Sequence, residues 1–122
     1  MANTFRQITF AAEPAGAGTP FVIYTVPDTT TTIVLGLMLS NLHSAAVTTE
    51  IELVSTTATG VNTGATQANT TAFLVNDLSI PIGGTLELLN GGKLVLQTGD
   101  ILRIDCSVAD KLSGALSIME IT

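Results

Sequence analysis

Basic side chains are scarce in this chain of 122 residues. Four lysines and arginines stand against ten aspartates and glutamates, which gives a formal net charge of −6. A nucleic-acid-binding protein needs a basic surface that displaces counterions from the phosphates, and four cations cannot supply one. Aromatic residues make up only 4% and include no tryptophan, which is too sparse for a base-stacking surface. The composition therefore predicts no nucleic-acid partner.

Cysteine and histidine occur once each, as Cys106 and His43. A single cysteine excludes an internal disulfide framework, and its apolar surroundings predict a buried thiol. One histidine and one cysteine would need two carboxylates to complete a structural zinc site, which is an uncommon ligand set. No nucleophile has a base beside it. We therefore expect no catalytic residues, no metal site and no cofactor, and hence no enzyme.

Long apolar runs are absent as well. The most apolar stretch, 33–39, falls far short of the roughly 18 residues that cross a bilayer. The start, Met1-Ala2-Asn3-Thr4, lacks the basic and apolar regions of a signal peptide. The sequence thus predicts no membrane partner and synthesis in a cytoplasm.

Apolar residues, by contrast, reach 46% with a mean hydropathy of +0.53. Charged residues make up 11%, against a usual level of about 25%. The surface must therefore consist mostly of small polar side chains, glycine and backbone. Such a surface repels other copies weakly, and we expect a partner to cover part of it.

Threonine beside valine, isoleucine and leucine favours strands, and glycine or proline interrupts the chain at short intervals. No window shows a helical period over a helix length. The sequence predicts an all-β fold: a single-domain, antiparallel, jelly-roll-like β-sandwich of about nine strands. The expected strands are 5–10, 21–26, 32–41, 48–54, 72–78, 85–89, 93–97, 101–107 and 114–121.

Three local patterns make this prediction specific. Segment 32–41 is apolar on both faces, which predicts a central strand that is covered on both sides. The next strand alternates, with Ile51 and Leu53 facing inward. Asn90-Gly91 between two apolar runs predicts a β-hairpin.

The carboxylates that could act in pairs have simple structural interpretations. Glu50 and Glu52 are two positions apart, so on a strand they share a face, which we expect to be solvated. Asp100 follows a glycine and is typical of a turn. Asp105 lies two positions from Arg103 and is expected to pair with it at the surface.

Two segments of small residues divide the chain. The stretch 11–20 (AAEPAGAGTP) separates an N-terminal strand or arm and linker, 1–20, from a β-sandwich domain, 21–122. Residues 1–10 either pair at a sheet edge or reach a neighbouring molecule. The uncharged stretch 55–69 is either a contact loop or a disordered tip. The expected protein-contact residues in these two segments are Phe5, Ile8, Phe10, Thr57, Val61 and Asn62.

Four segments together resemble a known family: 24–27 (YTVP), 32–41 (TIVLGLMLSN), 80–89 (IPIGGTLELL) and 93–102 (KLVLQTGDIL). They are similar to the small β-sandwich virion structural proteins of tailed bacteriophages, of the capsid decoration (cement) or tail accessory type. The resemblance runs from about residue 21 to the C-terminus. It implies a structural role on the particle, and it brings no active-site residues.

The leading functional hypothesis is therefore a capsid decoration protein that binds the outer surface of the major capsid shell and stabilises the head. Its expected partners are the major capsid protein and other copies of itself, in a homotrimer. Its expected location is the exterior of the phage head, after synthesis in the host cytoplasm. Alternatives are a tail, baseplate or fibre-adaptor module, and a carbohydrate-binding module, which the lack of tryptophan disfavours.

Overall fold

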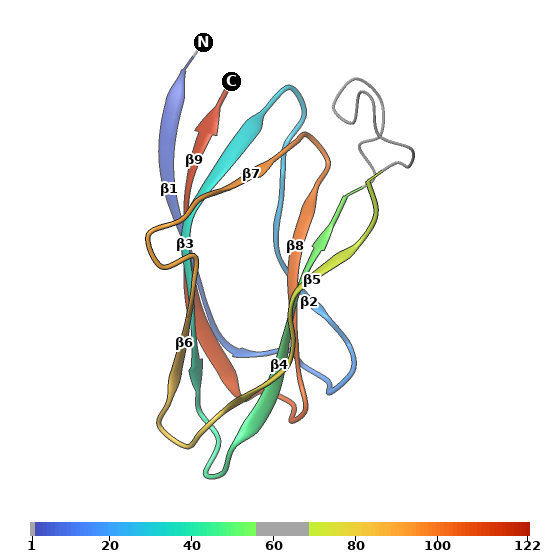
Figure 1. Ribbon diagram of the computed structural model, residues 1–122, viewed down its shortest axis with the longest axis vertical. Coiled ribbons are helices and arrows are strands. Elements are labelled where there is room, and N and C mark those ends of the chain that lie inside the picture. Colours follow the sequence, from blue (N-terminus) through green and yellow to red (C-terminus); the bar gives the residue numbers. More distant parts are fainter. Residues whose placement is uncertain (1, 56–68) are drawn as a thin grey trace.

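The chain folds as a sandwich of two antiparallel sheets (Figure 1). A computed structural model describes residues 2–55 and 69–122. Within them no helix could cross a membrane. The nine strands are β1 (Asn3–Glu13), β2 (Phe21–Thr25), β3 (Thr31–Asn41), β4 (Val47–Val54), β5 (Ala72–Ile80), β6 (Thr85–Leu88), β7 (Leu94–Leu96), β8 (Ile101–Cys106) and β9 (Leu112–Ile121). The prediction of an all-β sandwich with about nine strands is confirmed.

Successive strands alternate between the two layers except at β4–β5, which pair within one sheet, and at β6–β7, which both belong to the other. Sheet I has the order β1-β9-β3-β6, with β7 also paired to β3, and sheet II has the order β2-β8-β4-β5. Strands β6 and β7 pair with different halves of β3 and so share one strand position. The eight resulting positions wind as a jelly roll. The first and last strands lie side by side, and both chain ends lie at the same end of sheet I (Figure 1).

The turn at Asn90-Gly91 does not make the predicted hairpin. The amide of Gly92 donates to the carbonyl of Leu89, and Gly91 has a positive φ of 79°, so a tight turn does form. Strands β6 and β7 nevertheless pair with β3 and not with each other. The turn therefore connects two strands that lie one after the other along β3. Both form their backbone hydrogen bonds with β3, so no hairpin forms between them.

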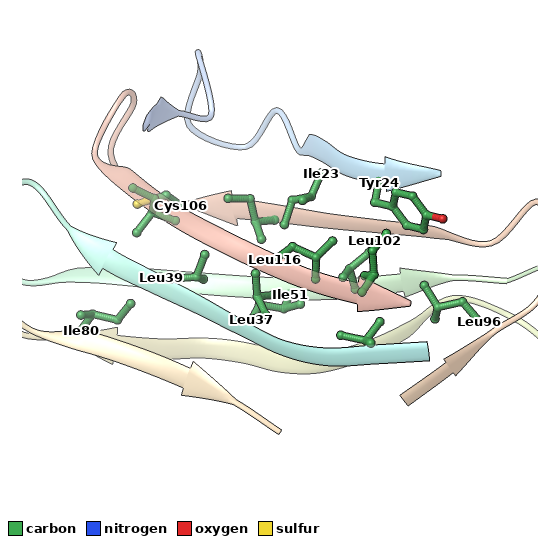
Figure 2. Close-up of a cluster of buried hydrophobic side chains, with 14 of the residues drawn as sticks. Ile23, Tyr24, Leu37, Leu39, Ile51, Ile80, Leu96, Leu102, Cys106 and Leu116 are labelled. Atoms are coloured by element: carbon green, nitrogen blue, oxygen red, sulfur yellow. The ribbon is translucent and has the colours of Figure 1, made fainter. Parts of the chain in front are cut away.

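The core lies between the inner faces of the two sheets (Figure 2). Leu37 and Leu116 from sheet I, and Ile51, Leu102 and Ile104 from sheet II, are at most 1% exposed. Burying a side chain of this size stabilises the fold by about 1.5–3 kcal/mol. The predicted inward position of Ile51 is confirmed, and Leu53 also packs against the core.

Strand β3 is central, as predicted, but only one of its faces is covered in this chain. Val34, Leu37 and Leu39 are buried, whereas Leu35 and Met38 are 37% and 47% exposed. A register shift between Val34 and Gly36 places an extra residue in the strand. The sandwich has only two layers, so the outer face of β3 has no sheet above it.

The N-terminal segment is the edge strand of sheet I. It pairs with β9 from Asn3 opposite Ile121 to Phe10 opposite Gly114. Strand β1 continues to Glu13, three residues into the predicted linker. The ring of Phe10 lies 5.5 Å from that of Phe21 of the other sheet, so this edge contributes to the core.

Candidate functional site

The expected contact residues of the N-terminal segment differ in their surroundings. Phe5 is 72% exposed, whereas Ile8 and Phe10 are half-buried and pack against the core. Thr57, Val61 and Asn62, expected in the loop 55–69, lie outside the described residues. Among the described residues 2–10, Phe5 is therefore the large apolar side chain that remains available to a partner.

Three carboxylates meet on the outer face of sheet II. Glu50 of β4 is opposite Asp105 of β8, and Asp77 of β5 lies beside them where the β4–β5 register shifts. Asp77 has a left-handed φ of 52°. The three line a hollow of about 140 Å³ together with Gly18, Thr48, Cys106 and Ser107. The sequence suggested other pairs of carboxylates, because only the sheet order β8-β4-β5 brings these three strands together.

The environment of Glu50 disfavours its charged form. Partial burial, a hydrogen bond with the Asp77 side chain and the negative charges around it raise the pKa of Glu50 above its usual range. Asp105 accepts hydrogen bonds from the amides of Gly18 and Cys106, at 3.1 and 2.8 Å. Nowhere in residues 2–55 and 69–122 are three or more acidic, histidine or cysteine side chains placed to hold a metal ion. The hollow is therefore a site of like-charge repulsion.

Replacing Glu50 by glutamine is expected to stabilise the protein at neutral pH. Because the folded-state pKa of Glu50 is raised, its charge destabilises the fold above that pKa, and this penalty disappears as the pH falls below the unfolded value of about 4.3. The gain should be a few tenths of a kcal/mol, since solvent screens the site, and should shrink with added salt. Urea unfolding at pH 7 and at pH 3.5 measures it. Glu87→Gln, the same change on exposed β6 of sheet I, is the matched control, and an equal gain there would contradict the explanation.

Glu52 and Arg103 form an ion pair that the sequence did not indicate. The guanidinium of Arg103 donates to the Glu52 carboxylate across the β4–β8 pair. The predictions of a solvated Glu52 and of an Arg103–Asp105 pair were wrong. Glu52 is directly opposite Arg103 on the neighbouring strand and is only 8% exposed, and such cross-strand neighbours are closer than residues two apart along a strand.

A second polar cluster ties the two sheets together at one end of the core. The hydroxyl of Tyr24 on β2 donates to Glu120 on β9 at 2.6 Å and lies 2.8 Å from the Thr32 hydroxyl. Arg6 on β1 donates to the other oxygen of Glu120 at 2.5 Å. These bonds from Tyr24 and Arg6 lower the pKa of Glu120. Burial and the bond to Glu120 raise the pKa of Tyr24 to about 12.

Tyr24→Phe should lower the free energy of unfolding at pH 7 by about 1–3 kcal/mol, because it leaves the buried Glu120 and Thr32 oxygens without that partner. The loss should diminish as the pH falls through the lowered folded-state pKa of Glu120, since the protonated acid no longer needs the donor. Above about pH 10 the unfolded tyrosine ionises first, so the wild type should lose stability there and the variant should not. Chemical unfolding across this pH range measures both effects. A difference that does not change with pH would contradict the role of Glu120.

The single cysteine, histidine and turn aspartate occupy structural positions. Cys106 is 3% exposed at the end of β8, and the prediction of a buried thiol is confirmed. His43 lies in the turn after β3, where its amide donates to the side-chain oxygen of Asn41. Asp100 accepts from the amide of Gln97 in a tight turn. Cys106 is among the residues that line the acidic hollow, whereas His43 and Asp100 are not.

Large apolar side chains are common on the described surface. Nine are between 37% and 72% exposed: Phe5, Val22, Leu35, Met38, Leu42, Phe73, Leu78, Ile82 and Val95. Single exposed apolar residues are normal, but contiguous ones mark interaction sites. The sequence predicted a surface of this kind from the low charge, but it did not show which residues form it.

Comparison with known proteins returned little. No protein-family model matches the chain, and no curated protein matches it. A solved structure described as "Bacillus endospore appendages form a novel family of disulfide-linked pili" is similar to it, at 16% sequence identity and a TM-score of 0.45. The alignment covers 99% of this chain and 87% of that one. A similarity this distant concerns the fold alone.

This finding contradicts the prediction of a phage capsid decoration protein: the similar structure is a bacterial spore appendage and not a phage capsid protein. The alternatives of a tail module and a carbohydrate-binding module have no support either. The resemblance to phage virion proteins, the location on a phage head and the absence of enzymatic activity stay predictions that these comparisons do not test.

Proposed function

We propose that this chain is a non-catalytic structural β-sandwich module that associates with further copies of itself. The observation that carries the proposal is that nine large apolar side chains of the described residues are exposed, in a chain that is only 11% charged. In a monomer these apolar side chains would stay in contact with water, and association would bury part of their surface. Closed symmetric assembly is the common solution for such chains.

The association would be non-covalent. Cys106 is the chain's one cysteine and it is buried, so a disulfide between copies would require the end of β8 to open. Without a covalent link, the assembled fraction depends on protein concentration, and association stabilises the fold by mass action.

The test is the solution mass of the wild-type chain by light scattering over a range of micromolar concentrations. We expect a mass that rises with concentration to a multiple of the 12.6 kDa of one chain. Twice this mass would indicate a dimer, and three times would indicate the trimer expected from the sequence. A mass of one chain at every concentration would contradict the proposed function.

A further inference from the structure

Four apolar residues form a row across sheet I. Phe5 is the partner of Met119 across the β1–β9 pair, Met119 is the partner of Ile33 across β9–β3, and Ile33 is the partner of Val95 across β3–β7. Side chains of directly opposed residues lie on the same face of an antiparallel sheet. We refer to Phe5, Met119, Ile33 and Val95 as the apolar row.

The apolar row points away from the core. Thr32 and Val34, on either side of Ile33, and Ile118, next to Met119, are fully buried. Since side chains alternate between the two faces of a strand, the row lies on the outer face of sheet I. Phe5 and Val95 at its two ends are 72% and 53% exposed.

The rest of this outer face is small, apolar or neutral. Two and four positions before Met119 on β9, Ser117 is opposite Gln7 and Gly36, and Ala115 is opposite Thr9 and Met38. The outward positions of the described strands β1, β9, β3 and β7 carry no charge. Glu87 of β6, the partner of Met38, places one charge at the margin of this face. Arg6 of the edge strand β1 is also exposed, but its side chain donates to Glu120, whose neighbours on the outer face are Met119 and Ile121.

Four of the ten acidic side chains belong to the opposite sheet. Glu50, Glu52, Asp77 and Asp105 belong to β4, β5 and β8 of sheet II. Two copies of a chain with a net charge of −6 repel least when these faces are kept apart, because Coulomb energy falls with distance and is screened beyond about 8–10 Å.

We propose that the outer face of sheet I packs against the same face of a second copy of this chain, across a two-fold axis. This inference rests on the proposed self-association and specifies its surface. In a two-fold contact each face must complement itself. An uncharged face needs no counter-charge on its partner, and a second copy brings another uncharged face while its acidic sheet points outward.

The outer face of sheet I is large enough for an interface with a second copy of the chain. Strands β1, β9 and β3 have ten or eleven residues each, so at about 3.3 Å per residue and about 4.8 Å between strands their face spans on the order of 500 Å² in projection. The accessible area of side chains exceeds their projection, and it approaches the roughly 800 Å² per partner of a standard interface. Sheets that pack face to face lie about 10 Å apart, which these side chains can fill.

The test compares two double variants of identical composition in the full chain. Phe5→Lys with Val95→Lys places two charges at the ends of the apolar row. Phe73→Lys with Val22→Lys makes the same substitutions on sheet II, at positions that are 52% and 46% exposed. Phe73 is opposite Glu52 and Val22 is opposite Arg103, so both lie on the outer face of that sheet. Light scattering gives the mass of each variant beside the wild type, and circular dichroism shows that each is folded.

We expect the sheet I variant to be a folded single chain where the wild type is a dimer, with a dissociation constant raised about 100-fold or more. The sheet II variant should associate like the wild type. If both variants associate normally, or only the sheet II variant dissociates, the assigned face is wrong while the proposed function stands. If the wild type itself never associates, the proposed function fails and this inference fails with it.

A second variant keeps the test decisive if the double variant does not fold. Ser117 is exposed at the centre of the face, two positions before Met119 on the same strand. Ser117→Lys replaces a small polar side chain, so we expect the single chain to fold, and the charge should weaken association as the double variant does. Normal association of folded Ser117→Lys would overturn the assigned face.

Discussion

Gly114→Ala is expected to lower the free energy of unfolding by about 3 kcal/mol, at the upper end of what overpacking costs. A Cβ at this position of β9 would overlap the carbonyl oxygen of Met38 on β3 and would lie 2.8 Å from the end of the Phe10 ring on β1. The backbone oxygen cannot rotate away as a flexible side chain could. The methyl group can be placed only if β9 moves relative to both of its neighbours.

Gly36→Ala is the matched control for this prediction. Gly36 lies on β3 of the same sheet, and a Cβ there would meet nothing within 4 Å. We expect a change within about 0.5 kcal/mol, as for surface substitutions without a special role. Equilibrium unfolding in urea measures both variants. Equal losses of stability at the two glycines would contradict the explanation that the contacts of Gly114 with Met38 and Phe10 leave no room for a Cβ.

Leu116→Ala should cost about 2–5 kcal/mol, because it removes a fully buried side chain and leaves a cavity. Leu116 lies on β9, opposite Leu37 of β3 and Ile8 of β1, and it points into the space between the sheets (Figure 2). The neighbouring Ser117→Ala, on the outer face, should change stability by less than about 0.5 kcal/mol. Thermal and urea unfolding give both values, and a small loss at Leu116 would contradict the packing of the two sheets.

The strands were predictable because alternation and turn residues are local signals. The core positions of β4 and β8 follow from simple alternation, and Ile51, Leu102 and Ile104 are buried as that pattern indicates. The turn in which the amide of Gly84 donates to Pro81 lies between the expected strands 72–78 and 85–89, where glycine and proline interrupt the chain.

Bulges and strand order could not be predicted in the same way. The extra residue at Leu35 and the register shift between Val22 and Tyr24 change which side chains face inward. As a result Tyr24 is buried beside Ile23, although alternation places them on opposite faces.

The candidate surface depends on pairing between distant segments, which no local pattern reveals. Phe5, Met119 and Val95 lie far apart in the sequence and become neighbours only through the order β1-β9-β3-β7. The contact residue Phe5 was expected from its segment alone, and the other members of the row were not. The clustering of Glu50, Asp77 and Asp105 was missed for the same reason.

Oxidative footprinting of the wild-type chain tests most directly whether a second copy covers the outer face of sheet I. Met38 lies on this face at 47% exposure, and Phe73 on the opposite sheet is 52% exposed. Hydroxyl radicals attack exposed side chains of both kinds, and methionine sulfoxide is detected by mass. As the concentration rises and copies associate, oxidation of Met38 should slow while that of Phe73 stays constant. Association that leaves Met38 as reactive as in the single chain, or that protects Phe73 instead, would contradict the account.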